Sequence, residues 1–593
     1  MFFTHAHIRQ NKIALTSPIM ITTSTLRLIL FCHLFIASTC RRIAVIGGGI
    51  SGTFVSKYLA EYDKDCSILE IAIFDPLPLG EPTTEISGPD WQGSRVASVR
   101  MEDGGVVEIG ASVFYSGFYL VMEMVTADPT LKIGRAFNNG SSTELDPGLR
   151  DGMGIYNGNG DWKFLAAKSS VWWFFTKMAW RYNIDLYRAF SAVSKAQRSF
   201  EVMNHLLHSE HETTFFENPA DLWDSVGLLN AAHNSYDAFL DALAVCKSFN
   251  TLPWWRRLLP YQGCLREELL AAVTLVNYNQ GTSQANGLVG LGSFVATKVN
   301  LVSLVGGNQQ MIASAYRQAQ SLSESTCHKQ GIIKHVQQRI TTVVASLEHM
   351  ELFSHDISLG QYDVVILAAP LPMSRVDFLV QSQKDASVLT PMPFDMINVE
   401  DHKPNDDEHP AMPRPLPDFA TRPYTQVVTT LVSGAELNST YFHLDPDGLP
   451  RGIYMTEHGK AQEHSITAIA QMTTVSGVYK IFSSKELGDE LLKVMFGESH
   501  KVEVVKIWGG PNGGATPDYQ GAGWTINYLL YDAGNGIKGH SHGAALYYTN
   551  AIETSMACME LSAIGAKSVA KLVAKRLGLV VPHNGTKVQS DEL

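Results

Sequence analysis

The sequence predicts an α/β protein with a discontinuous Rossmann-type domain and a second, α+β domain. The first observation is a short apolar strand at 41–46 that runs directly into a glycine-rich turn and an apolar helix. The second is that apolar strands and a long helix return far along the chain, at 362–370, 544–548 and 554–577. Alternating strands and helices are typical of a mostly parallel sheet with helices on its faces. Because these segments are far apart, one domain has to be assembled from separated pieces.

The glycine-rich turn at 47–52 has the spacing Gly-x-Gly-x-x-Gly. The first glycine allows a tight turn, the second lets the backbone approach a pyrophosphate, and the third lets the helix pack on the strand. The N–H groups at the start of the helix would hold the pyrophosphate. An acidic residue ends the next apolar run, 69–74, where it would accept hydrogen bonds from a ribose. The residues predicted to bind a dinucleotide, NAD or FAD, are Gly47, Gly49, Ile50, Ser51, Gly52 and Asp75.

Length and composition indicate a large protein of at least two domains. The chain has 593 residues, of which 45% are apolar and 18% charged, and its net charge is −12. This negative charge argues against a nucleic-acid partner, which requires a basic surface. We assign a dinucleotide domain to 41–115, 285–371 and 525–580, a substrate domain to 116–284 and 372–524, and a C-terminal tail to 581–593.

The first part of the chain predicts targeting to the secretory pathway. Residues 1–40 read as a signal peptide with an N-terminal extension, since an apolar run of signal-peptide length follows Arg27. The destination is left open between the lysosome or vacuole, the ER lumen and secretion. In that pathway, glycosylation is predicted at Asn139, Asn438 and Asn584.

The cysteines and histidines do not predict a metal site. Five cysteines follow residue 40, and none form a Cys-x-x-Cys pair, so one or two disulfides of unknown pairing are expected. His205, His208 and His211 fit a polar helix face better than a ligand set. We therefore expect no metal.

Two further segments favour FAD over NAD. Gly93-Ser94-Arg95 resembles the Gly-Gly-Arg segment of amine-oxidase-like flavoproteins, in which the backbone amides and the arginine face the pyrophosphate. The last long helix is predicted to begin near Glu553, so that its N-terminus points at the flavin's pyrimidine edge. These segments extend the predicted cofactor-binding set to Gly93, Ser94, Arg95, Gly110, Ala111, Ser112, Glu553, Ser555 and Met556.

Other segments make the resemblance more specific. Through them the chain resembles the prenylcysteine oxidase, or farnesylcysteine lyase, family over nearly its whole mature length. Some of them also read simply as core strands. The similar segments lie at 154–158, 180–182, 277–280, 306–308, 428–432, 480–483, 550–553, 555–556 and 559–564.

The resemblance implies an FAD-dependent oxidase that cleaves the thioether of S-farnesyl- or S-geranylgeranyl-cysteine. Oxygen and water would be consumed, and cysteine, a prenyl aldehyde and hydrogen peroxide would be formed. Such an enzyme needs a long apolar slot for the prenyl chain, and aromatic clusters at 172–175 and 254–257 would line it or rest on a membrane surface. No catalytic side chain is predicted, because hydride loss beside sulfur requires no strong base.

Three departures from the family pattern leave alternatives open. Asp75 replaces a glutamate, Ser94 replaces a glycine, and Val305 replaces a glutamate before Gly306. One alternative is another amine-oxidase-fold flavin oxidase acting on a polyamine or an amino acid. The other is a lipid-binding relative without catalysis.

Overall fold

The computed structural model describes most of the chain between Arg41 and Leu579. The predicted signal peptide, the predicted tail, Gly93, Asn139, Asn584 and the aromatic run 254–257 lie outside the described residues. The residues not described are 1–40, 82–93, 103, 136–151, 166–170, 209–214, 247–262, 296–299, 383–384, 386, 394–395, 399–423, 446–447, 473–474, 476, 510–523, 535–542 and 580–593.

A six-stranded sheet forms the Rossmann-type part, in the order β10-β2-β1-β14-β25-β24. The strands from β10 to β25 are parallel, and β24 is antiparallel at the edge. The inner strands β2, β1, β14 and β25 are largely buried, which explains their mostly apolar sequences, whereas the edge strands β10 and β24 are only partly buried. Their bounds are β1 Arg41–Ile46, β2 Ile68–Phe74, β10 Ile333–Val336, β14 Val364–Leu367, β24 Leu529–Asp532 and β25 Ala545–Tyr548.

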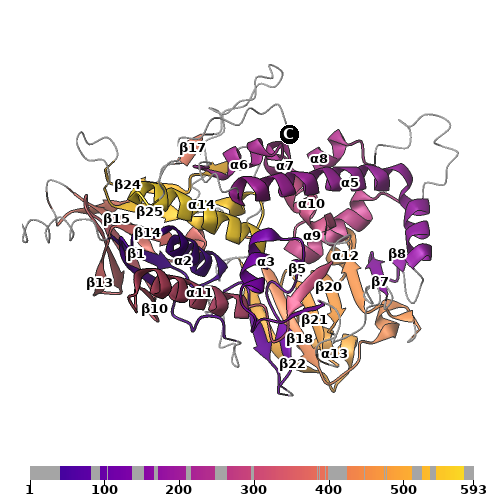
Figure 1. Ribbon diagram of the computed structural model, residues 1–593. Coiled ribbons are helices and arrows are strands. Elements are labelled where there is room, and N and C mark those ends of the chain that lie inside the picture. Colours follow the sequence, from indigo (N-terminus) through magenta and orange to yellow (C-terminus); the bar gives the residue numbers. More distant parts are fainter. Residues whose placement is uncertain are drawn as a thin grey trace, which may run out of the picture. The chain divides into compact units, whose positions relative to one another are not determined.

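Three helices pack along this sheet and come from distant parts of the sequence. Helix α2 (Ile50–Tyr62) contacts both α11 (Gln310–Cys327) and α14 (Met559–Leu577) and lies between them in Figure 1. The prediction of an α/β fold with a discontinuous Rossmann-type domain is confirmed. A small sheet, β13-β12-β11-β15-β16, is attached to this part, with bounds β11 Thr342–Ala345, β12 Met350–Ser354, β13 Ile357–Tyr362, β15 Asp377–Gln381 and β16 Leu389–Pro391.

A seven-stranded sheet, β22-β18-β21-β20-β19-β7-β8, builds the α+β part. Helix α9 contacts β19 and β20 of this sheet, and α10 packs against α5, α7, α8 and α9 (Figure 1). The strands are β7 Met153–Tyr156, β8 Trp162–Leu165, β18 Val427–Ser433, β19 Gly452–Met455, β20 Ile466–Gln471, β21 Tyr479–Ser483 and β22 Lys501–Trp508. The helices are α5 Val171–His208, α6 Pro219–Ser225, α7 Leu229–His233, α8 Tyr236–Ala242, α9 Ala271–Tyr278 and α10 Gly287–Val295, with α12 Glu457–Gln462 and α13 Asp489–Phe496 beside the strands.

Short elements connect the two parts. Strands β3 and β4 form a hairpin just before the segment that contains Gly110. The remaining bounds are β3 Ser98–Arg100, β4 Val106–Glu108, β5 Phe114–Tyr115, β6 Ile133–Arg135, β9 Leu301–Leu304, β17 Met396–Asn398, β23 Trp524–Ile526 and α3 Tyr119–Thr126.

The predicted start of the last helix is wrong. Residues Thr549–Thr554 form a 3-10 helix, and α14 begins only at Met559, after Cys558 caps it through its Sγ. The 3-10 turn persists because Asn550 and Glu553 hydrogen-bond to each other inside the protein. The predicted helix 554–577 placed Cys558 inside the helix, whereas Cys558 is the N-cap of α14.

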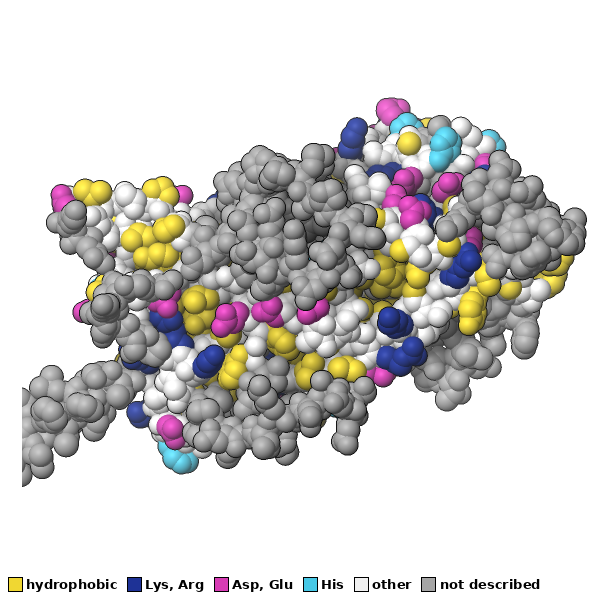
Figure 2. Space-filling model, turned by 90° about the horizontal axis from the view of Figure 1, so that it is seen from above, with side chains coloured by type: hydrophobic (Ala, Val, Ile, Leu, Met, Phe, Trp, Pro, Cys, Tyr) yellow, Lys and Arg dark blue, Asp and Glu magenta, His cyan; other side chains and the backbone are white. Residues whose placement is uncertain are grey.

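On the face seen in Figure 2, the described Lys and Arg side chains are interspersed with Asp and Glu. Within the described residues, no helix combines the length and the apolarity that crossing a membrane would require.

The described part of the chain contains two disulfides, one between distant residues and one between residues 18 positions apart. Cys66, just after α2, is bonded to Cys327 at the end of α11, and Cys246 is bonded to Cys264. Cys558 is the free cysteine of the described part of the chain. The structure therefore supplies the pairing that sequence spacing left open.

Removing the Cys66–Cys327 bridge by the double substitution C66S/C327S should lower the free energy of unfolding by about 2–4 kcal/mol. The bridge joins residues 261 positions apart, and closing such a loop restricts the unfolded chain. Denaturant unfolding without reductant measures the effect. C246S/C264S, which opens a bridge of separation 18, should cost less. Equal midpoints for wild type and C66S/C327S would contradict the prediction.

Candidate functional site

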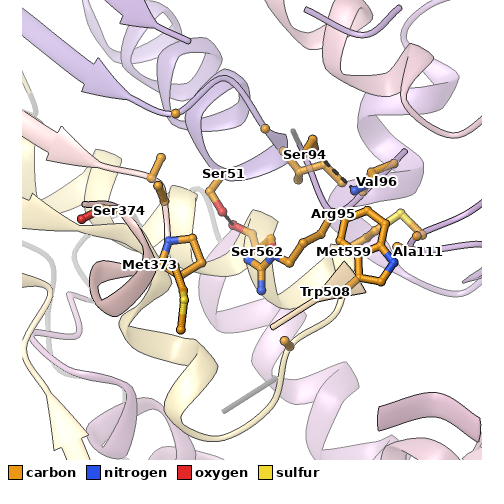
Figure 3. Close-up of a pocket in the computed structure, with 18 of the residues that line it drawn as sticks. Ser51, Ser94, Arg95, Val96, Ala111, Met373, Ser374, Trp508, Met559 and Ser562 are labelled. Carbon is orange, nitrogen blue, oxygen red and sulfur yellow. Dashed lines mark hydrogen bonds between the residues drawn. The ribbon is translucent and has the colours of Figure 1, made fainter. Parts of the chain in front are cut away.

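A cavity of about 360 Å³ runs from the carboxyl ends of β1 and β2 to the seven-stranded sheet. Figure 3 shows Met373 and Ser374 at one side of it, Ser51 near the middle, and Trp508, Met559 and Ala111 at the other side. Ligands of open α/β sheets bind outside the carboxyl ends of the strands. The cavity therefore lies where the glycine motif predicts a dinucleotide.

The glycine motif has the geometry that its spacing predicts. Gly47 has a φ of +108°, and Gly49 is the N-cap of α2. A Cβ on Gly52 would lie 1.9 Å from the Gly47 carbonyl oxygen, so only glycine allows the helix to pack this closely. Gly47, Gly49, Ile50 and Ser51 line the cavity, whereas Gly52 does not. The exposed N–H groups of α2 form a cradle for an anionic group.

Asp75 lies at the cavity beside this cradle. One carboxylate oxygen accepts a hydrogen bond from the Gly48 N–H at 2.7 Å, and the other accepts one from the Leu77 N–H at 2.9 Å. Burial raises the pKa of Asp75, and the two N–H donors oppose this shift. Each oxygen keeps a free lone pair, so the carboxylate can also accept from a ribose hydroxyl.

Arg95 lines the cavity, and its guanidinium is paired with the carboxylate of Glu553, which lies 458 residues later in the sequence. Both terminal guanidinium nitrogens donate to the Glu553 carboxylate, one of them at 3.0 Å. Asn550 Nδ2 donates to the same carboxylate at 2.8 Å, and the Tyr424 hydroxyl donates at 3.3 Å. Glu553 is therefore a buried partner of Arg95, and it does not start a helix that points at a flavin.

The other predicted cofactor residues divide into two groups. Ser94, Gly110 and Ala111 line the cavity, whereas Ser112, Ser555 and Met556 lie behind its wall. The Ser555 hydroxyl accepts a hydrogen bond from the Trp223 indole at 2.9 Å. The predicted set did not include the residues at the start of α14 that reach the cavity. They are Ala557 and the N-cap Cys558, which precede the helix, and Met559 and Ser562 in its first turn.

The end of the cavity beside the seven-stranded sheet is largely apolar. Phe482 of β21 and Trp508 of β22 line it, and the Trp508 indole donates to Thr429 at 3.1 Å. Tyr278 and Cys558 also lie here. Burial raises the pKa of the Tyr278 hydroxyl, and it raises the pKa of the Cys558 thiol to about 12, so both remain protonated at neutral pH.

A buried polar cluster behind Gly110 and Ala111 was missed by sequence reasoning. It comprises Glu108, Asn308 and Lys480, of which Lys480 was read only as part of a core strand. Asn308 Nδ2 donates to the carbonyls of Ala111 and Ser112 at 3.0 and 2.9 Å. The signal for this cluster in the sequence was Lys480, a lysine inside an apolar strand. Hydrophobic periodicity alone does not indicate what role such a lysine has. Val305, the departure from the family pattern, is 61% exposed and lies outside this cluster.

Comparisons with known proteins agree with the resemblance seen in the sequence. A family model described as prenylcysteine lyase matches residues 165–399 and 388–581. Prenylcysteine oxidase 1 of Rattus norvegicus is 27% identical over 555 residues, covering 90% of this chain and 89% of that protein. Farnesylcysteine lyase of Arabidopsis thaliana is 22% identical over 537 residues, covering 90% and 88%.

Among solved structures, cyclohexylamine oxidase from Brevibacterium oxydans aligns with a TM-score of 0.47 and 13% identity, covering 91% of this chain and 99% of that one. A fatty acid isomerase from P. acnes aligns with a TM-score of 0.45 and 12% identity, covering 90% and 98%. The family model covers more than half of the chain, so the chain belongs to the prenylcysteine lyase family, and the expectation of an oxidase of this family is confirmed at that level.

Proposed function

We propose that this protein is an FAD-dependent oxidase that cleaves the thioether of S-prenyl-L-cysteine. Prenylcysteine, oxygen and water would give cysteine, a prenyl aldehyde and hydrogen peroxide. The observation that carries the proposal is one continuous cavity, which joins the α2 cradle and Asp75 to an apolar end at Phe482 and Trp508. Because the chain belongs to the prenylcysteine lyase family, we propose prenylcysteine as the substrate that binds in this cavity.

The residues fit FAD from the α2 cradle to the Gly110–Ala111 wall, which leaves the apolar end beside Phe482 for the substrate. The N-terminus of α2 would hold the pyrophosphate and Asp75 the adenosine ribose. Arg95 can add positive charge near the pyrophosphate only in part, because Glu553 already neutralises it. FAD, when bound, supplies the two-electron acceptor for the carbon beside sulfur. The redox half of the cofactor would then lie toward Gly110 and Ala111.

The apolar end would bind and orient the prenyl carbon. Phe482, Trp508 and Met559 offer apolar surface and keep bulk water away from the reacting carbon. The protonated Tyr278 and Cys558 cannot act as strong bases there, and the proposed reaction does not need one. Water is required only once, to add its oxygen at the carbon that has lost hydride.

Location in the secretory pathway is also part of the proposal. Asn438 is an exposed residue of a sequon and suits glycosylation there. Peripheral contact with a membrane is proposed as well, because α5 exposes Trp180 and Tyr187 to 60% and 70%. Aromatic side chains of this kind prefer the interface of a bilayer.

Anaerobic mixing with S-farnesylcysteine tests the function. We expect the purified protein to show a flavin absorption band that bleaches on mixing, because the substrate reduces the cofactor. S-Dodecylcysteine is the matched control, since its carbon beside sulfur is not allylic. Bleaching by a polyamine or a free amino acid instead would support another oxidase, and a band that no substrate bleaches, together with bound lipid, would support a non-catalytic binder.

A further inference from the structure

Lys480 is a buried cation that the reaction proposed above does not use. It lies on β21 and is 6% exposed. Its ammonium donates to the Glu108 carbonyl oxygen at 3.1 Å and to the Ser112 hydroxyl at 2.6 Å. Within the described part of the chain, it forms no ion pair at 4.0 Å or less. Both acceptor atoms are neutral, and the charged group that acts on the ammonium is the Glu108 carboxylate, which forms no ion pair with it at this distance.

The ammonium lies behind the cavity wall formed by Gly110 and Ala111, where the redox half of the cofactor is proposed to bind. Its two acceptors flank Gly110 and Ala111, which line the cavity. On the same face of β21, Phe482 also lines the cavity, and Lys480 Nζ is 5.1 Å from the centre of its ring. Lys480 therefore connects the substrate-side sheet to the Glu108–Ser112 segment.

Packing alone does not explain a lysine at this position. Burying an ammonium away from water is costly unless a partner compensates for it. Burial lowers the pKa of Lys480 to about 8, opposed by the nearby Glu108 carboxylate. Burial also raises the pKa of Glu108 to about 7. A methionine would fill the same space without the cost of burying an ammonium. The positive charge at this position therefore indicates a function other than packing.

We propose that Lys480 is a positioning residue that makes the redox half of the cavity electrostatically positive and thereby stabilises negative charge on the cofactor. Acting through Ser112 and the backbone of Gly110 and Ala111, the ammonium favours the anionic, electron-rich form of a bound flavin. This inference rests on the proposed function only in requiring that the cavity hold a flavin. It does not depend on which substrate reduces it.

The affinity of the flavin for sulfite tests this inference without any turnover. Sulfite adds to an oxidised flavin and leaves it electron-rich. Loss of the visible absorption band of the flavin monitors this addition. Lys480→Gln keeps a hydrogen-bond donor and removes only the charge, so we expect it to weaken sulfite binding at least about tenfold. Lys480→Met should do the same, and Lys480→Arg should restore most of the affinity.

Lys506 supplies the matched control. It is a second buried lysine on the same face, on β22, with its Nζ 5.2 Å from the Trp508 ring centre. No hydrogen bond to the Glu108–Ser112 segment is found for it among the described residues, so Lys506→Met should change sulfite affinity much less.

Two outcomes overturn the inference. If Lys480→Gln binds sulfite as tightly as wild type, the charge of Lys480 has no role. If Lys506→Met loses as much sulfite affinity as Lys480→Gln, the contact of Lys480 with Ser112 has no specific role. If Lys480→Met does not fold, Lys480→Gln still decides. A wild-type protein without flavin would refute the cofactor of the proposed function and this inference with it, whereas flavin that farnesylcysteine does not reduce would refute only the substrate.

Discussion

Gly52→Ala should abolish cofactor binding. An added Cβ would lie 1.9 Å from the Gly47 carbonyl oxygen and 3.2 Å from Val45 Cγ1, so α2 would have to move away from β1. That movement would break the cradle of N–H groups that faces the cavity. We expect the affinity for FAD to fall at least about 100-fold, or about 2.7 kcal/mol. The flavin content of the purified protein and titration of the cofactor-free protein with FAD measure the loss.

Gly488→Ala is the matched control for this substitution. Gly488 is likewise a glycine at the start of a helix, α13, with a φ of −72°. A Cβ there would meet nothing within 4 Å, so cofactor binding should not change. If Gly52→Ala binds FAD as tightly as wild type, the packing of α2 does not determine the site.

Glu553→Ala should destabilise the protein by about 2–3 kcal/mol, less than for a fully buried pair, because the Arg95 guanidinium that loses its carboxylate is 28% exposed at the cavity. Glu553 raises the pKa of Arg95, and its removal does not let the guanidinium lose its proton at neutral pH. Asn550 and Tyr424 would also lose an acceptor. We expect the Tm of the cofactor-free protein to fall by roughly 2–3 °C.

A double substitution separates the loss of the pair from the cost of the unpaired charge. Arg95→Met with Glu553→Leu removes both charges and should recover most of the lost stability, since a buried pair is often replaceable by apolar residues. Lys493→Ala, which breaks the exposed ion pair with Asp489, should leave Tm unchanged. A Glu553→Ala protein as stable as wild type would show that water compensates Arg95.

Local features of the sequence were sufficient to predict the cofactor cradle. The turn at 47–52, the strand before it and the acidic residue after β2 are short-range patterns, because each depends on consecutive residues. The strands β14 and β25 were also predicted close to their observed bounds, since continuous burial leaves a continuous apolar run. The family-specific segments added the substrate class.

The start of the last helix shows where local reasoning fails. A helix from 554 agrees with the sequence pattern, but the chain first makes a 3-10 turn and is capped again at Cys558. Glu553 looks like an ordinary acid at a helix start. Its contact with Arg95 spans 458 residues, and no periodicity reports such a contact.

By itself, the sequence determined the Rossmann-type fold class, the N–H cradle around Gly49 and membership of the family, because short continuous motifs carry each of them. Only the tertiary structure decided how the charges behind the cradle are paired. Lys480 and Ser112 are 368 residues apart and become hydrogen-bonded only when the two sheets meet. Whether a buried charge is satisfied depends on every element around it, and those elements come together only in the folded chain.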